Sequence, residues 1–254
     1  MVFALAVLAS VPAIAFSQSP VILLPPIDGP SKPSIDGFWT NPGEWSKASE
    51  TVVNYSDGTI LVIRAMGDAD FIYVLLEMPQ DYRVDGHAAI CFDTLRDGGP
   101  YLASDDYCFV LGETLREYHG DGKTTLMQQA AISQNILAAR SVTGDNSPYE
   151  SPQDHVTYEF KVPIDHLGAD GAPYGFYVTF DTRGQTNNYT YYYSWPDSKN
   201  AAYLRVIPPR SWGVISSSSD VEVPEFPLPV VGAIAGVIGV MAVATRTKLF
   251  RSWR

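Results

Sequence analysis

Two cysteines and two aspartates occupy matching positions on two short apolar segments, which are joined by a loop rich in Gly and Asp. An antiparallel pairing that sets Cys91 opposite Cys108 also sets Asp93 opposite Asp106, with all four side chains on one face. Opposed thiols can join in a disulfide, and the alternative is two free thiols in the core. A single register thus predicts both a disulfide and a pair of facing carboxylates.

The facing carboxylates indicate a cation site in the same loop. Like charges directly opposite each other on a sheet are unfavourable by up to about 1 kcal/mol, so a positive charge between them would be stabilising. Asp97 and Asp105, with Asp93, Asp106 and backbone carbonyls, would supply the oxygen ligands that Ca²⁺ prefers. The alternative is a solvated acidic turn in which the carboxylates point apart.

A dense aromatic run, NYTYYYSW, occupies residues 188–195. In an extended strand Tyr191, Tyr193 and Trp195 share one face, because side chains alternate between the two sides. Exposed rings stack on the apolar faces of sugars, so these three residues and Trp212 are candidate sugar-binding residues. If the shared face points inward, the rings belong to the core instead.

Other chemistry has little support in the sequence. A net charge of −11 disfavours binding to the phosphates of nucleic acid. The four histidines are scattered without metal-ligand spacing, and no serine-hydrolase, zinc-protease or phosphate-loop motif occurs. We therefore expect a binding or structural protein and not an enzyme.

Short strands separated by Gly, Asp and Pro carry these residues. Between residues 34 and 209 apolar side chains recur with a period of two, most clearly at residues 156–162, where the second face is polar and expected to be wet. Residues 71–76 are apolar on both faces, as in a central covered strand. Further strands are expected at residues 60–65, 87–92, 107–111, 176–180 and 202–207. The pattern predicts an all-β domain, a two-sheet antiparallel β-sandwich with a jelly-roll-like arrangement.

The two ends of the chain indicate export and anchoring. Residues 1–17 contain an apolar run of signal-peptide length, and residues 18–33 are expected to form a linker. After the domain, residues 210–223 are rich in Ser and acidic residues, as in a flexible stalk. Residues 228–244 carry no charge and precede a basic tail, which predicts one transmembrane helix with the domain outside.

Pieces of the middle segment together resemble family 9 carbohydrate-binding modules and the wider group of DOMON-like sandwiches. They occur in order between residues 34 and 208 as IDG, EW, FIYV, CFD, DDY and YEFKVP. The resemblance implies a β-sandwich, a structural Ca²⁺ and a sugar clamped between two Trp side chains. Trp195 would be one of the two, with Trp45 or Trp212 as its partner. A non-catalytic module that binds a glycan or a cell-envelope polysaccharide is the function we expect.

The same resemblance keeps two other functions open. Some DOMON-like relatives are haem-binding electron-transfer domains with Met and either His or Lys as axial ligands, for which Met66, Met78 and His87 are the candidates here. A structural cell-envelope protein without a small ligand is the other alternative.

Residues 224–254 resemble a sorting signal. Pro224, Glu225 and Phe226, followed by the apolar run and the basic tail, are similar to the PEF-type C-terminal signals of archaeal surface proteins. The resemblance implies a membrane transpeptidase as a partner, and an ordinary stop-transfer anchor is the alternative. Both predict an extracellular domain anchored at the cell surface. Asn54 and Asn188 begin N-glycosylation sequons, which suit that location.

Overall fold

The computed structural model of the chain describes residues 19–29, 32–83, 85–124, 127–143, 146–149, 154–168, 173–183, 190–197 and 207–217. All of them belong to the first of two units into which the chain divides, Met1–Ser218. The expected signal peptide, sorting motif, transmembrane helix, basic tail and the sequon at Asn188 lie outside these ranges. Within the ranges, no helix has the length and apolar character that crossing a membrane requires.

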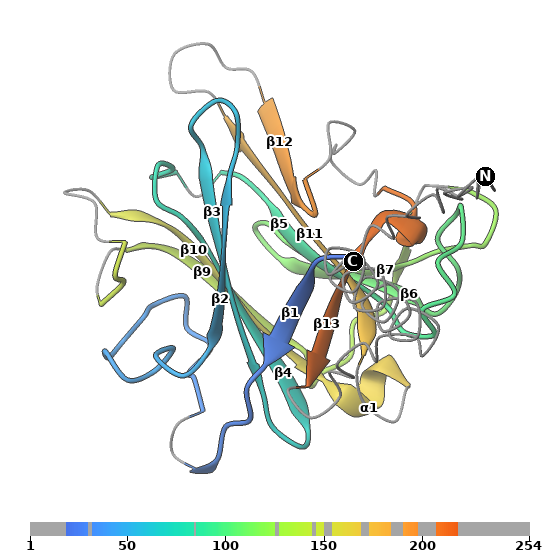
Figure 1. Cartoon of the computed structure of the whole chain (residues 1–254), viewed down its shortest axis with the longest axis horizontal. Helices are drawn as coiled ribbons and strands as arrows, with labels where there is room; N and C mark the ends of the chain where they lie inside the picture. Colours follow the sequence, from blue (N-terminus) through green and yellow to red (C-terminus); the bar gives the residue numbers. More distant parts are fainter. Residues whose placement is uncertain are drawn as a thin grey trace, which may run out of the picture. The chain divides into compact units, whose positions relative to one another are not determined.

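Two β-sheets make up the described part of the domain (Figure 1). The larger sheet has the strand order β1-β13-β11-β5-β6-β7-β8, and β12 also pairs with β11. Its strands are β1 (Val21–Leu24), β5 (Ala88–Asp93), β6 (Asp106–Leu111), β7 (Leu115–His119), β8 (Gln128–Ala130), β11 (Tyr174–Arg183), β12 (Thr190–Trp195) and β13 (Gly213–Ser217).

The smaller sheet has the order β2-β3-β4-β10-β9. Its strands are β2 (Ser49–Asn54), β3 (Ile60–Gly67), β4 (Phe71–Met78), β9 (Leu137–Thr143) and β10 (His155–Pro163). The described residues also include two short helical segments, α1 (Ile164–Leu167) and η2 (Pro209–Ser211). The all-β, two-sheet prediction is confirmed, and the expected strands at residues 60–65, 71–76, 107–111 and 176–180 fall within β3, β4, β6 and β11.

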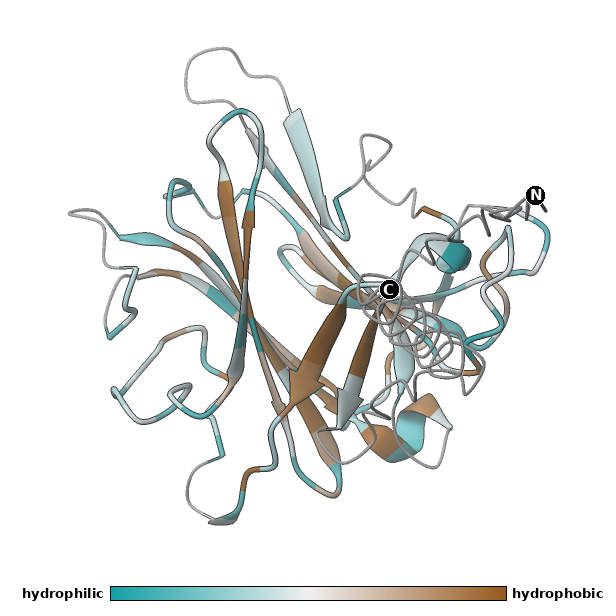
Figure 2. Ribbon diagram, in the orientation of Figure 1, coloured by the Kyte–Doolittle hydropathy of each residue, from teal (hydrophilic) through white to brown (hydrophobic). Residues whose placement is uncertain are grey.

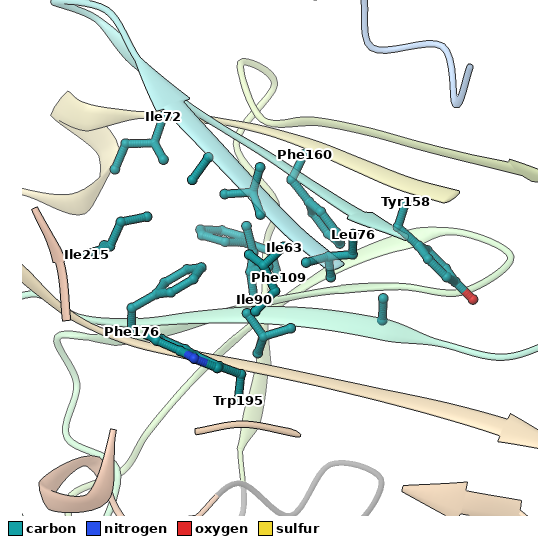
Figure 3. Close-up of a cluster of buried hydrophobic side chains, with 14 of the residues drawn as sticks. Ile63, Ile72, Leu76, Ile90, Phe109, Tyr158, Phe160, Phe176, Trp195 and Ile215 are labelled. Carbon is teal, nitrogen blue, oxygen red and sulfur yellow. The ribbon is translucent and has the colours of Figure 1, made fainter. Parts of the chain in front are cut away.

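The main core lies between the sheets. Ile63, Leu76 and Phe160 come from the smaller sheet, and Ile90 and Phe176 come from the larger one (Figure 3). Each large apolar side chain buried in this way contributes roughly 1.5–3 kcal/mol. In Figure 2 the most hydrophobic residues lie along strands such as β1, β3 and β4, whereas β12 and most turns are hydrophilic or neutral.

The prediction that the polar face of β10 is exposed to solvent is wrong. Thr157 and Glu159 are buried like the apolar residues beside them. Strand β10 is central, because it pairs with β4 on one side and β9 on the other. Its outer face is covered by the segment before β2, where Trp45 is buried and bonded to Glu159. A segment that is distant in sequence therefore shields from solvent a strand face that the local sequence indicates to be polar.

The sheet extends beyond both expected limits of the domain. Strand β1 lies in the segment expected to be a linker, and β13 lies in the segment expected to be a stalk. They pair in parallel, Val21 with Val214 through Leu24 with Ser217, as an exception to the antiparallel pairing elsewhere in the described strands. The expected strand at 202–207 lies outside the described ranges except for Ile207.

Candidate functional site

The hairpin of β5 and β6 has the register that the sequence predicts. Cys91 pairs with Cys108, and Asp93 pairs with Asp106. The two cysteines form a disulfide with their Cα atoms 4.1 Å apart. The disulfide expectation is therefore confirmed, and the same pairing fixes the two carboxylates opposite each other.

The carboxylates at the end of this hairpin lie close together, and some of their oxygens accept no hydrogen bond. Carboxylate oxygens of Asp93, Asp105 and Asp106 lie within 4.8 Å of one another. Asp93 and Asp106 are 2% and 1% exposed, and Oδ1 of each is buried without a hydrogen-bond partner. Gly98 N donates to Asp93 Oδ2 at 3.1 Å, and Ala103 N donates to Asp106 Oδ2.

Burial is the main cause that raises the pKa values of these acids. It raises the pKa of Asp93 above its usual value and that of Asp106 to about 8, and neighbouring carboxylates add to both shifts. Asp97 is one of those neighbours, although it does not join the three convergent carboxylates. Buried anionic oxygens without donors are costly unless a cation or a proton neutralises them.

The aromatic run lies on β12, and the face that Tyr191, Tyr193 and Trp195 share is directed at the core. They pair with Thr182, Phe180 and Val178 on β11. Trp195 is 5% exposed, and its ring centroid lies 6.0 Å from that of Phe176. Figure 3 shows the two side chains side by side in the core. Tyr193 is also buried, and Tyr191, nearer the start of the strand, is exposed where the core ends.

A cleft of about 300 Å³ lies beside the exposed end of this run. Tyr193 forms part of its wall, stacked on Phe180 with centroids 4.9 Å apart. The Tyr193 hydroxyl donates to Asp57 Oδ2 at 2.7 Å and accepts a hydrogen bond from Thr59 at 3.0 Å. The cleft thus combines aromatic rings with polar groups, and its lining includes Asp57, Thr59, Gln80, Asp81, Arg83, Phe180, Thr182, Tyr191 and Tyr193.

The fold of this chain is similar to that of known carbohydrate-binding modules, although its sequence is not. No protein-family model matches the chain, and no curated protein matches it in sequence. Among solved structures, a family 9 carbohydrate-binding module (CBM9) from Caldicellulosiruptor kristjanssonii in complex with cellotriose matches with a TM-score of 0.52 and 16% identity, over 82% of this chain and 100% of that module. A CBM9 of the same organism in complex with glucose matches with a TM-score of 0.51 and 16% identity, over 80% and 98% of the two chains. The fold is a CBM9-like β-sandwich.

The tryptophans of the CBM9-like sandwich within the described ranges are all buried. Trp45 is 0% exposed, Trp195 5% and Trp212 3%. Trp212 stacks on Tyr177 with centroids 5.7 Å apart and donates its indole N–H to the Ile207 carbonyl at 2.7 Å. None of these rings is presented to solvent for a two-Trp clamp, because each fills the core or the covering layer. Of the four predicted sugar-binding residues, Tyr191 and Tyr193 line the cleft.

The candidate haem ligands are not brought to one site. Met66 is buried in the cluster under the segment before β2, whereas Met78 is buried in the main core between the sheets. His87 lies on a different cleft of about 310 Å³ and pairs with Asp181, Nδ1 to Oδ2, at 3.2 Å. Met78 also lines the cleft beside Tyr191, so the three candidate ligands belong to different clusters and clefts of the described residues.

Sequence reasoning missed the polar half of the cleft. Asp57 and Thr59 lie in the turn between β2 and β3, and Gln80 follows β4. They are single polar residues in or near turns. Because such residues are common in every protein, their positions along the chain indicated no binding site. Only the return of β12 along β11 brings them beside Tyr191 and Tyr193.

Proposed function

We propose that this CBM9-like sandwich is a non-catalytic carbohydrate-binding domain, exposed at the cell surface, that holds a sugar in the cleft beside Tyr191. The observation that carries the proposal is the cleft itself, where an exposed tyrosine ring adjoins carboxylate, amide and guanidinium groups. An aromatic face packs on the C–H face of a pyranose, and the polar groups hydrogen-bond its hydroxyls. Its volume is near the lower limit of about 300 Å³ for small-molecule sites, which suits one or two sugar units.

The fold supports the same ligand class. The two matching modules were solved with cellotriose and with glucose, so these sugars are the first probes to use. Here tyrosines of β12 line the cleft, whereas the tryptophan of that strand, Trp195, is buried.

A pair of neighbouring residues provides a matched test of the cleft. Tyr191 and Tyr192 are both exposed but lie on opposite faces of β12, because side chains alternate along a strand. We expect calorimetric titration with cellotriose to detect binding to the full chain, and Tyr191→Ala to weaken it about tenfold. Tyr192→Ala is the control and retains the wild-type affinity. Equal loss in both variants contradicts the assignment of the cleft, and a blank glycan array for the wild type contradicts carbohydrate binding.

We also propose that Asp93, Asp105 and Asp106 hold a structural Ca²⁺. The chemistry of the donor set fits, since all three offer hard oxygen ligands and two buried oxygens lack any donor. Gly175, the β11 partner of Asp93, keeps the site open, because an added Cβ would lie 2.9 Å from the Asp93 Cβ. A bound Ca²⁺ would neutralise the carboxylates and fasten the loop between β5 and β6.

The proposed location rests on the ends of the chain and on the disulfide. Export is implied by residues 1–17, and anchoring is implied by residues 224–254 with Pro224, Glu225 and Phe226. The bond between Cys91 and Cys108 suits an oxidising exterior. Protease treatment of intact cells tests the location: the domain should be digested from outside, and a product protected in the cell interior would contradict surface exposure.

A further inference from the structure

The segment between β4 and β5 contributes to two clefts. Asp81 and Arg83 line the cleft beside Tyr191, whereas Asp85 and His87 line the cleft of about 310 Å³. This second cleft is also lined by residues from the turn after β6, from β7 and from β9, including Gly112, Glu113, Thr114, Arg116 and Arg140. The two clefts share no described lining residue, so the second is a separate candidate site.

Two glycines allow the close approaches that shape the second cleft. A Cβ added to Gly112 would lie 2.4 Å from His87 Cδ2, so the His87 ring lies directly against the turn after β6. A Cβ added to Gly86 would lie 2.3 Å from the carbonyl oxygen of Asp181 on β11. His87 Nδ1 lies 3.2 Å from Asp181 Oδ2, which fixes the orientation of the ring. The cleft is therefore bounded by groups that are held in place by their own contacts.

Arg140 supplies a partly buried positive charge to the second cleft. Its Nη1 donates to the carbonyl oxygen of Gly86 at 2.7 Å, and no carboxylate among the described residues forms an ion pair with it. Burial raises the pKa of the Tyr158 phenol, and the positive charge of Arg140 beside it acts in the opposite direction. A guanidinium group stays charged, and a charge partly removed from water is costly without a counter-ion. An anionic group bound in the cleft would supply that counter-ion.

The other charged side chains of the lining are of both signs. Arg116 and His87 are basic, whereas Asp85 and Glu113 are acidic. The two acidic side chains are exposed, so water and salt screen their repulsion of an anion. Their carboxylates accept hydrogen bonds from hydroxyl groups, and the hydroxyl of Thr114 can donate or accept. The lining therefore suits a ligand that combines one carboxylate with several hydroxyls.

We propose that the second cleft binds an acidic sugar, whose carboxylate pairs with Arg140 and whose hydroxyls bind Asp85 and Glu113. Guanidinium and carboxylate groups join through two parallel hydrogen bonds, which fix orientation as well as charge. No aromatic side chain is among the described lining residues, so the second cleft has no ring on which a neutral sugar stacks. The site extends carbohydrate binding to a second class of sugar, and it does not depend on the cleft beside Tyr191.

Glucose and glucuronic acid form a matched pair of probes, because a carboxylate replaces one hydroxymethyl group. We expect calorimetric titration of the full chain with glucuronate to detect binding, and Arg140→Gln to weaken it at least about tenfold. Arg140→Lys keeps the charge but loses the planar fork, so it should also weaken binding. Arg116→Gln alters an exposed side chain and should weaken binding severalfold without disturbing the fold. Arg210→Gln, which removes the same charge from an arginine outside the lining of both clefts, is the control.

The outcomes separate this site from the cleft beside Tyr191 and from general attraction of anions. A wild type that gives no heat with glucuronate overturns the proposal, whether or not cellotriose binds. Glucuronate binding that is lost in Tyr191→Ala but kept in Arg140→Gln assigns the acidic sugar to the other cleft and also contradicts it. Equal loss in Arg210→Gln, or displacement by sodium sulfate but not by sodium chloride of equal ionic strength, shows a general anion effect and overturns the sugar assignment. Failure of cellotriose binding alone contradicts the cleft beside Tyr191 and not the second cleft.

Discussion

Trp45 donates its indole N–H to Glu159 Oε1 at 3.0 Å, across 114 residues of sequence. Both side chains are fully buried. The second oxygen of Glu159 accepts hydrogen bonds from the backbone N–H groups of Asp36 at 3.0 Å and Gly37 at 2.8 Å. This one carboxylate therefore holds the segment before β2 on the outer face of the smaller sheet. The separate motifs IDG, EW and YEFKVP belong to one hydrogen-bonded cluster.

Removing the indole donor should destabilise the domain. Trp45→Phe leaves an oxygen of Glu159 without its donor in the interior, so we expect a loss of about 1–3 kcal/mol in the free energy of unfolding. Trp39→Phe is a matched control, because Trp39 is buried in the same cluster but its Nε1 has no hydrogen-bond partner. Urea unfolding of both variants measures the difference. A larger loss in Trp39→Phe would show that ring volume, and not the hydrogen bond, is what matters.

Glu159 should also make stability depend on pH. Burial raises its pKa to about 8 from 4.5, against the opposing effect of its three donors. The unfolded carboxyl ionises near pH 4.5 while the folded one keeps its proton, so the native state binds more protons between these values. Stability therefore falls as pH rises from 5 to 8, by up to about 1.4 kcal/mol per pH unit from this group.

Glu159→Gln isolates that contribution. The variant cannot ionise, so its unfolding free energy should change less between pH 5 and pH 8 than that of the wild type. The comparison is made in urea with saturating Ca²⁺, so that the acidic loop is in one state throughout. Identical slopes in the two proteins would assign the pH dependence to other groups.

The disulfide should be a main source of stability. It closes a loop between cysteines 17 residues apart, and the loss of such a cross-link costs roughly 3 kcal/mol through the entropy of the unfolded chain. We expect the double variant Cys91→Ala/Cys108→Ala to unfold at lower urea concentration. A reductant should bring the wild type to the same midpoint and leave the variant unchanged; a wild type that is indifferent to reductant contradicts this role.

Removal of Ca²⁺ should lower the melting temperature of the wild type. A ligand present at 100 times its dissociation constant stabilises the folded state by about 2.7 kcal/mol, and a chelator removes this contribution. Asp106→Asn should lose the response, whereas Asp97→Asn should keep it, because Asp97 lies outside the three convergent carboxylates.

The sign of the Asp106→Asn effect is a second check. Without Ca²⁺ the variant should melt at or above the wild type, because it lacks one of two facing buried carboxylates. With Ca²⁺ the order should reverse. A chelator that leaves the wild-type melting temperature unchanged would contradict the cation site.

The sequence by itself determined what depends on neighbours along the chain. Runs of apolar residues indicated β3, β4, β6 and β11. One antiparallel register sets Cys91 opposite Cys108 and also Asp93 opposite Asp106, so both pairs could be predicted correctly. A period of two places side chains on two faces, but it does not say which face becomes covered.

Only the tertiary structure decided that coverage. In the folded domain Trp195 is buried in the core, whereas Tyr191 lines a cleft. Glu159 is buried beneath Trp45. Strand β1 pairs with β13, although their segments were expected to be a linker and a stalk. Long-range contacts set these outcomes, because burial depends on which distant segment packs against a face. The contacts of His119 and His166 with Glu117 have the same origin, because His166 is far from the other two residues in sequence and becomes their neighbour only in the folded domain.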